Sequence, residues 1–216
     1  AAPNSPAGQS DASPVRLDAQ RVLSAHADPV TGVAFSPDGS VLATCGYDGL
    51  VRLWDVDDCA GTRCLRTLVA GRESESAPLA GCGGVSFSPN GRYVLVSCLD
   101  GAVRLFPTTP AAGAGGADAA AVRTFRGHAN ARYSMPAAMV RLAGGRQLVL
   151  ACSEGGAAGF VHVWDMQTAS PVCVLPASGD GASGGGDAPR FAALAVTPDG
   201  LVASSRGGRL FLHVLS

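Results

Sequence analysis

Two short strings in the last third of the chain contain residue types that could perform chemistry. Gly181–Gly185 has the G-x-S-x-G spacing of a nucleophilic serine at a sharp strand-to-helix turn. The overlapping Gly179–Gly184 has the G-x-G-x-x-G spacing of a dinucleotide phosphate loop. Both lie in one Gly-rich stretch, and Pro189 and the apolar run 191–196 follow in place of the helix that either motif needs. Neither string therefore predicts an active site.

The histidines and cysteines also lack the pattern of a reactive site. The chain has four His and seven Cys, an odd number of cysteines, and no C-x-x-C pair. Cys45, Cys98 and Cys152 recur in apolar segments, where cysteine behaves as a small buried residue rather than as a unique nucleophile beside a His. We therefore expect no catalytic residue, no metal, no cofactor and no disulfide framework, in a reducing compartment.

The composition excludes several classes of partner. The 216 residues are 47% hydrophobic and 15% charged, with a net charge of −1, which is typical of a globular protein without a basic nucleic-acid surface. No apolar run approaches the ~20 residues of a membrane span. Residues 1–14 lack the features of a signal or transit peptide, and the chain begins with Ala rather than Met, so we expect a processed chain or a fragment.

An internal repeat organises the chain. Similar turns end at Gly39, Gly91 and Gly200, with a weaker one at Gly145, so the spacings are 52, 54 and 55 residues. The three clearest turns read Ser-Pro-Asp-Gly, Ser-Pro-Asn-Gly and Thr-Pro-Asp-Gly, each between short apolar runs. Proline fixes one backbone angle of such a turn and glycine accepts a positive φ, so each turn predicts a β-hairpin.

Each repeat unit contains four strand-like runs and no sustained helical periodicity. Two units end a strand with Trp-Asp, at Trp54 and Trp164, which is the pattern of a WD-repeat propeller blade. We therefore predict an all-β WD-repeat β-propeller with four consecutive four-stranded antiparallel blades after a disordered segment at 1–20. The blades, within 21–216, are expected at about 21–58, 59–110, 121–168 and 171–216, with surplus length in loops 57–63, 108–121 and 177–188.

Blades of WD-repeat proteins are held by a buried hydrogen-bonded tetrad of His, Ser or Thr, Asp and Trp. The first unit matches all four positions, and the third unit matches two of them but has no Asp in its turn at 154–159. The matching residues are His26, Thr44, Asp48 and Trp54, then His128 and Trp164. Phe106 and His213 replace Trp in the other two units, which we expect to be held mainly by apolar packing.

Longer strings resemble one branch of these proteins, the family of WD-repeat-containing protein five. The similarity extends from about residue 21 to the end and is weakest in the last unit. The strings are Ala25–Val30, Tyr47–Asp55, Phe87–Tyr93, Gly127–Tyr133 and Trp164–Thr168. Members of that family are non-catalytic propellers in COMPASS/trithorax-type histone H3 lysine-4 methyltransferase complexes. Their ring has seven blades, so the resemblance implies that this chain forms an open arc of such a ring.

The resemblance implies an arginine-binding channel on one face. Aromatic rings of the family stack on a partner's guanidinium group, which has planar faces and five N–H donors. Tyr133 falls at a stacking position, and three further residues fall at channel-lining positions: Thr31, Tyr47 and Ser134. Gly84 and Pro136 stand where the family has phenylalanines, and the second stacking aromatic would lie on blades outside this sequence.

The resemblance also implies a cleft on the opposite face for an extended acidic-hydrophobic peptide of another subunit. The matching positions are Asn90, Tyr93, Leu105, Met139, Arg141 and Gln167. A Tyr and a Leu suit apolar contact, and an Asn and a Gln suit pairing with a peptide backbone. The alternative is that Asn90 is a turn residue and Leu105 a core residue.

These observations predict a nuclear, non-catalytic scaffold that binds peptide segments of chromatin-modifying subunits and the histone H3 tail. The alternative is a cytoplasmic or ciliary WD-repeat scaffold, or a ubiquitin-ligase substrate receptor, without histone contact. We expect no direct nucleic-acid, membrane or small-molecule partner. An enzyme on a propeller is the least supported hypothesis.

Overall fold

The computed structural model describes residues 22–56, 63–72, 74, 76–109, 120–154, 161–175, 194–197, 200–206 and 209–215. Every regular element in these ranges is a β-strand, which confirms the all-β prediction. The described ranges contain no helix with the length and apolar character needed to cross a bilayer. Most of the three expected long loops, the 1–20 segment and both enzyme-like strings lie outside the described residues.

Fifteen strands in the described ranges form four antiparallel sheets, which we number 1 to 4 along the chain. Sheet 1 contains β1 (Val30–Phe35), β2 (Val41–Gly46), β3 (Leu50–Asp55) and β4 (Cys64–Val69). Sheet 2 contains β5 (Cys82–Phe87), β6 (Tyr93–Cys98), β7 (Ala102–Pro107) and β8 (Arg123–Arg126). Sheet 3 contains β9 (Ala137–Arg141), β10 (Gln147–Cys152), β11 (Val161–Asp165) and β12 (Pro171–Leu175). Sheet 4 contains β13 (Leu194–Val196), β14 (Leu201–Arg206) and β15 (Arg209–Val214).

The sheets are offset by one strand from the sequence units, which corrects the expected blade boundaries. β4, β8 and β12 open the next unit in sequence, yet they pair with β3, β7 and β11 of the preceding sheet. Val22 and Leu23, expected to open the first blade as a strand, are not in a strand. The offset arises because the third strand of each sheet has an open edge, and the segment that follows it in the chain pairs with that edge in antiparallel fashion.

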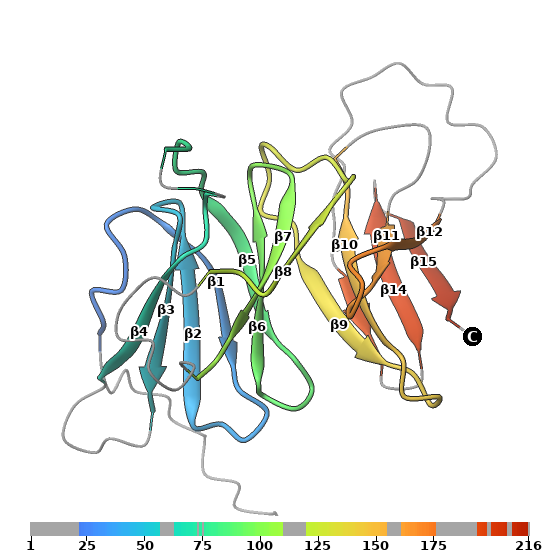
Figure 1. Ribbon diagram of the computed structural model, residues 1–216, viewed down its shortest axis with the longest axis horizontal. Coiled ribbons are helices and arrows are strands. Elements are labelled where there is room, and N and C mark those ends of the chain that lie inside the picture. The colour runs from blue at the N-terminus through green and yellow to red at the C-terminus, as the bar shows by residue number, and fades with distance from the viewer. Residues whose placement is uncertain are drawn as a thin grey trace, which may run out of the picture.

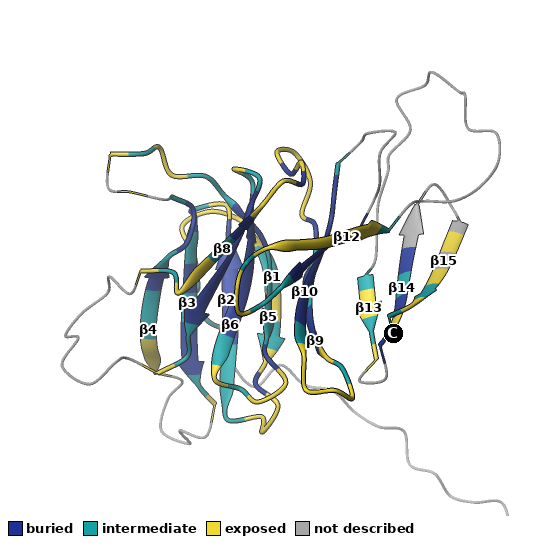
Figure 2. Ribbon diagram, turned by 45° about the vertical axis from the view of Figure 1, so that its right-hand side comes forward, coloured by how far each residue is buried: buried dark blue, intermediate teal, exposed yellow. Residues whose placement is uncertain are grey.

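The four sheets stand side by side in chain order, from sheet 1 on the left of Figure 1 to sheet 4 on the right. Three apolar cores fill the spaces between successive sheets. The first strands contact one another in the series β1, β5, β9 and β13. The deepest burial lies in the middle strands of sheets 1 to 3, and the outer strand β12 is largely exposed (Figure 2). Sheet-on-sheet packing therefore positions the described turns at either end of the strands.

The repeated turns have the backbone that their sequence predicts. Gly39, Gly91, Gly145 and Gly200 have φ values of 78°, 68°, 82° and 85°, in the left-handed region that favours glycine. Within the first turn the Ser36 hydroxyl donates to Asp38 Oδ1, and its oxygen accepts the Val41 N–H at 2.9 Å. These local hydrogen bonds fix the hairpin between the first and second strands of the sheet.

Candidate functional site

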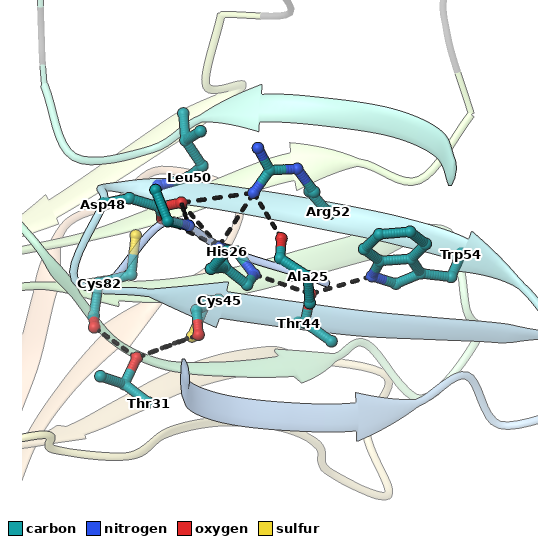
Figure 3. A network of polar contacts seen from close by, with 11 residues as sticks. Ala25, His26, Thr31, Thr44, Cys45, Asp48, Leu50, Arg52, Trp54 and Cys82 are labelled. Atoms are coloured by element: carbon teal, nitrogen blue, oxygen red, sulfur yellow. Dashed lines mark hydrogen bonds and ion pairs between the residues drawn. The ribbon is translucent and has the colours of Figure 1, made fainter. Parts of the chain in front are cut away.

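The tetrad residues of sheet 1 lie together in one polar network (Figure 3). Trp54 Nε1 donates to Thr44 Oγ1 at 3.0 Å, and Thr44 Oγ1 lies 2.8 Å from His26 Nε2. His26 Nδ1 lies 2.9 Å from Asp48 Oδ1, and the His26 side chain is fully buried. Every member is paired when His26 carries its proton on Nδ1, because Thr44 can then donate to Nε2 while it accepts from Trp54.

Asp48 is the charged end of this network. Burial alone would raise the pKa of Asp48, but hydrogen bonds from His26 and the Leu50 backbone N–H outweigh it and lower the pKa below its ordinary value. Arg52 Nη1 donates to Asp48 Oδ2 at 3.3 Å and to the Ala25 carbonyl at 2.7 Å. The network therefore joins the β2–β3 turn to the segment that leads into β1.

Sheet 2 contains a buried ion pair that the sequence reasoning missed. Arg104, only 1% exposed, donates to both carboxylate oxygens of Asp100 and to the Ala70 carbonyl at 3.0 Å. Apolar residues of sheet 2 fill the cores on both of its sides, in line with the expected apolar packing, and the ion pair adds a polar contact to it. The signal was available in the repeated Asp-Gly-x-x-Arg spacing, because Asp48 and Arg52 form the matching pair in sheet 1.

Sheet 3 keeps the histidine and tryptophan of the tetrad but not their hydrogen bonds. Trp164 Nε1 donates to the Arg126 carbonyl at 3.0 Å, because Ala151 supplies no hydroxyl on the face that Thr44 occupies in sheet 1. His128 is 6% exposed, and both of its ring nitrogens lack a hydrogen-bond partner. Its ring packs edge-on against Trp164, with the ring centroids 5.4 Å apart. The centroid of the His162 ring lies 6.1 Å from that of His128. Burial, with a smaller effect of His162, lowers the pKa of His128 to about 4.

The predicted arginine-channel residues lie at one end of sheets 1 and 2. Tyr47, on the β2–β3 turn, is 42% exposed, and Tyr133, between β8 and β9, is 43% exposed. A Cβ added at Gly81 would lie 2.8 Å from the Tyr47 ring, and one at Gly83 would lie 3.3 Å from Ser134 Cα. The glycine-rich start of β5 therefore runs between these two tyrosine-bearing segments.

The surroundings of Gly84 leave no room for the aromatic side chain that the family has at this position. A Cβ on Gly84 would lie 3.3 Å from Ser97 Oγ and 3.4 Å from the Met135 carbonyl, and Met135 is 1% exposed. Ser97 donates to that same carbonyl. The segment before Pro136 thus packs against Gly84, where a phenylalanine side chain would not fit. Thr31, the remaining predicted channel residue, uses its hydroxyl to donate to the Cys82 carbonyl at 2.7 Å (Figure 3).

Glu154 holds the segment that carries Tyr133. One carboxylate oxygen of Glu154 accepts the backbone N–H groups of Ala131, Arg132 and Tyr133 at 2.8, 2.6 and 2.8 Å. A carboxylate that accepts several backbone N–H bonds fixes the local chain direction strongly. The sequence reasoning missed this residue, since it treated the turn only as lacking an Asp.

The predicted peptide cleft is divided between core and surface. Leu105 and Met139 are 1% and 9% exposed and belong to the core between sheets 2 and 3, which corrects the expectation that they line an open cleft. Tyr93 is half-buried against the same core. Arg141 and Gln167 are exposed. These five residues therefore lie around the junction of sheets 2 and 3. Of the five, only Tyr93, Arg141 and Gln167 are exposed enough to contact a partner.

Asn90 has the turn role that was its alternative interpretation. Its side-chain oxygen accepts from the Ser88 hydroxyl at 2.7 Å and from the Arg92 N–H at 3.1 Å. This arrangement repeats the role of Asp38 in the first hairpin. Within the described ranges, no three His, Cys, Asp or Glu side chains are grouped closely enough to hold a metal ion.

Replacing Thr44 with Val should destabilise the protein by about 1–3 kcal/mol, because it leaves the Trp54 N–H and His26 Nε2 without their partner. The measurement is denaturant unfolding at pH 7. Thr67→Val is the matched control, because the Thr67 hydroxyl lies 3.8 Å from the exposed Cys64 thiol rather than in a buried network. Equal effects of the two substitutions would contradict the structural importance of the network.

Acidification should destabilise sheet 3 through His128. Its pKa is about 4 in the folded chain, below the ordinary histidine value of 6.5, so the unfolded chain binds the proton more readily. Stability should therefore fall as the pH drops from above 6.5 to about 4, with a contribution of His128 of about 3 kcal/mol at most. His128→Phe should lose that part of the pH dependence in denaturant titrations, whereas the part due to Asp48 should remain. Parallel curves for the variant and the parent chain would refute this.

Comparisons with known proteins place the repeat in a family. The WD domain, G-beta repeat, matches residues 18–55 and 63–106. The chain is 36% identical over 91 residues to the COMPASS component SWD3 of Saccharomyces cerevisiae, covering 40% of this chain and 27% of that protein. It is 38% identical over 92 residues to mouse Protein Atg16l2, covering 41% of this chain and 13% of that protein. It is 50% identical over 46 residues to mouse Striatin-4, covering 21% of this chain and 6% of that protein.

The chain thus spans about an eighth to a quarter of the length of the first two of these relatives. The matched segments contain β1 to β3 and β4 to β7, together with both Asp-Gly-x-x-Arg ion pairs. The same succession of antiparallel strands continues through sheets 3 and 4. Residues 18–55 and 63–106 therefore contain WD repeats, and the antiparallel four-stranded sheets have the arrangement of WD-repeat β-propeller blades.

Proposed function

We propose that this chain is a non-catalytic scaffold of a COMPASS-like histone H3 lysine-4 methyltransferase complex in the nucleus. Its partners would be peptide segments of other subunits and an arginine-bearing segment such as the histone H3 tail. The similarity to the COMPASS component SWD3 supports the complex. The observation that carries the proposal is the pair of half-exposed tyrosines, Tyr47 and Tyr133, on either side of the glycine-rich start of β5.

The chemistry of that end suits a guanidinium group. Tyr133 offers a ring face for stacking, and Glu154 keeps the backbone beneath it in place. Gly81 lies against the Tyr47 ring and Gly83 against Ser134, the neighbour of Tyr133, and backbone carbonyl oxygens beside the two tyrosines would be suitable acceptors for N–H donors. Arginine binding would need no reaction step, only the pairing of donors with acceptors.

The opposite end of the seam between sheets 2 and 3 suits an acidic peptide. Arg141 at the end of β9 and Gln167 after β11 are exposed, and Tyr93 adds a partly exposed ring. Arg141 would contribute a charge-assisted contact, and Gln167 an amide for pairing with an extended backbone. Leu105 and Met139 would support this surface from below rather than contact the peptide.

The similarity to Protein Atg16l2 favours a second candidate, a scaffold that binds protein partners outside chromatin. The same surfaces would then bind segments of other complexes. Affinity capture from nuclear and cytoplasmic extracts with the tagged chain, followed by identification of the bound proteins, separates the two. Recovery of methyltransferase subunits supports the first proposal, and their absence with recovery of a cytoplasmic complex supports the second.

An H3-tail peptide with its arginine should bind the chain and should bind less tightly after Tyr133→Ala. Loss of the stacking ring should cost about 0.5–2 kcal/mol, or about 2- to 30-fold in Kd. Isothermal titration calorimetry measures the change. A peptide with citrulline in place of arginine is the matched ligand control, because it keeps the shape and loses the charge. Equal binding of the two peptides, or an unchanged Kd for the variant, would contradict arginine stacking.

An acidic partner peptide should bind at the Tyr93 end, with an affinity that falls as salt rises. Arg141→Glu should weaken binding further than Arg141→Ala, because it adds a like charge to an acidic ligand. Arg132→Glu, at the Tyr133 end, is the matched control and should leave this affinity unchanged. Fluorescence anisotropy at two salt concentrations gives the peptide affinity of the parent chain and of the three variants. If the control and Arg141→Glu weaken binding equally, the effect is one of net charge and not of this surface.

A further inference from the structure

Two cysteines of sheet 2 stand directly opposite each other. Cys82, the first residue of β5, pairs in register with Cys98, the last residue of β6, and both are fully buried free thiols. On the outer side of this pair the Leu99 N–H donates to the Gly81 carbonyl at 2.9 Å. The cysteines are therefore a non-hydrogen-bonded pair of the antiparallel ladder, in which facing Cα atoms lie about 4.5 Å apart and side chains are closest. A disulfide needs Cα atoms about 4.4–6.8 Å apart, so this backbone can accommodate one without moving.

The two thiols interact with each other. Cys82 keeps its proton and hydrogen-bonds to Cys98, which raises the pKa of Cys82 and lowers that of Cys98. Burial raises the pKa of both thiols, but the Arg104 guanidinium beside Cys98 acts in the opposite direction at that sulfur. Arg104 is held there by its ion pair with Asp100. Cys98 is therefore the sulfur of the pair that more readily becomes a thiolate, the form that reacts with oxidants.

The surroundings of Cys98 tolerate the loss of its proton. The Cys98 thiol lies 3.2 Å from the Ala70 carbonyl, which also accepts from Arg104 Nη1 at 3.0 Å. A disulfide at Cys98 would remove only the weak S–H contact and would leave the Arg104 donor on that carbonyl. The buried acceptor therefore keeps a partner in both redox states.

The other described cysteines lack this arrangement. Cys45 belongs to the same core, but it faces Gly32 and Val51 across the strands, and burial raises its pKa to about 11. Cys152 faces Val161, and burial raises its pKa to about 12. The two exposed cysteines also stand opposite residues other than cysteine. Among the described residues, one facing pair of thiols thus combines disulfide geometry with a reactive sulfur.

We propose that Cys82 and Cys98 form a redox site, in which a hydroperoxide closes a reversible disulfide between the start of β5 and the end of β6. The oxidant is hydrogen peroxide or an organic hydroperoxide. In the first step the Cys98 thiolate attacks one peroxide oxygen and the O–O bond breaks. The second oxygen leaves as hydroxide or alkoxide and takes up a proton, and Cys98 becomes a sulfenic acid.

The second step uses the facing thiol. The Cys82 sulfur attacks the Cys98 sulfur, and the S–S bond forms as the S–O bond breaks. The hydroxyl group leaves as water with the proton of Cys82. Over both steps the two sulfurs lose two electrons, which the peroxide accepts. A dithiol reductant reverses the change by thiol–disulfide exchange and is itself oxidised to a disulfide.

The pair lies at the end of its ladder, where an oxidant can reach it. The next residues outward, Gly81 and Leu99, are both partly exposed, and the backbone hydrogen bond between them closes the ladder beyond the cysteines. Such ends open locally at a much lower free energy than the whole fold. Opening of this end would expose both sulfurs to a peroxide, a molecule little larger than water.

The disulfide would join two segments that have different contacts. On the β5 side, the Cys82 carbonyl accepts from the Thr31 hydroxyl at 2.7 Å, which connects it to β1 (Figure 3). On the β6 side, the chain continues into the turn in which Asp100 binds Arg104. A cross-link stabilises a protein mainly by restricting the unfolded chain, so the oxidised protein should resist unfolding better than the reduced one. The cross-link needs no partner protein, so it is independent of the proposed function.

Peptide mapping after oxidation tests the pairing directly. Hydrogen peroxide is added to the reduced chain until the exposed thiols are consumed, and the remaining thiols are blocked in denaturant before digestion with trypsin. Cleavage after arginine places Cys82 in peptide 73–92 and Cys98 in peptide 93–104. We expect these two peptides as one cross-linked species, lighter by two hydrogen atoms than the two thiol peptides together and separated by dithiothreitol. Absence of this species would overturn the proposal.

Three substitutions separate the roles of the sulfurs. Cys45→Ala, in the same core and equally buried, is the matched control and should keep the cross-link. In Cys82→Ala the Cys98 sulfenic acid has no facing thiol, so dimedone added with denaturant should label Cys98. In Cys98→Ala the Cys82 thiol should stay unlabelled. Labelling of Cys82, or a cross-link between Cys82 and Cys45 in the parent chain, would contradict the assigned pair.

Denaturant unfolding measures the effect of the cross-link on the fold. The unfolding equilibrium constant of the parent chain should be about 10- to 100-fold smaller after oxidation than before it. Cys45→Ala should show the same gain, whereas Cys82→Ala and Cys98→Ala should show none. Equal stability of the oxidised and reduced parent chain would mean that the cross-link strains the sheet, and would overturn the proposal.

Discussion

The whole arrangement depends on the need of a half-apolar β-sheet to cover both of its faces. A four-stranded sheet of this length cannot bury its own side chains, and in this chain each sheet uses the next one for that purpose. Valine and leucine in the third strand of one sheet meet aliphatic and aromatic residues in the first strand of the following sheet. The candidate binding residues lie at the ends of the strands, where this packing places the turns and local hydrogen bonds, such as those of Glu154, fix their conformation.

Against that common apolar packing, the polar networks differ from sheet to sheet. Sheet 1 has a complete chain of donors and acceptors from Trp54 to Asp48, and sheet 2 replaces it with the buried pair of Arg104 and Asp100. Sheet 3 keeps His128 without partners for its ring nitrogens. A buried polar group without a partner costs free energy, so the sheets need not contribute equally to stability although they share one backbone plan.

The fold could be read from the sequence because its signals are local and repeated. The turn glycines at regular spacing and the Trp-Asp strand ends predicted the hairpins, and the structure confirms an all-β chain. The strand partners were harder to predict. In sequence β4 looks like the first strand of the second unit, but in the structure it pairs with β3 of sheet 1. For the cleft, the family pattern identified Leu105 and Met139 by position, but burial depends on the neighbouring sheet and cannot be read from one unit. The role of Glu154 could not be predicted, because its three partners are backbone N–H groups, which every residue except proline has and no sequence pattern distinguishes.

The offset between sequence unit and sheet has a mechanical consequence. Because β4 belongs to sheet 1 but is followed directly by the segment that enters β5, the chain crosses from one sheet to the next only after it has been hydrogen-bonded into the first. Tension applied between neighbouring sheets therefore loads the β3–β4 ladder along its length, where several hydrogen bonds share the force. Had each unit been a separate sheet, the same pull would act on a bare linker and on side-chain contacts alone. The interlocked strand thus adds main-chain hydrogen bonds to the apolar cores that hold neighbouring sheets together.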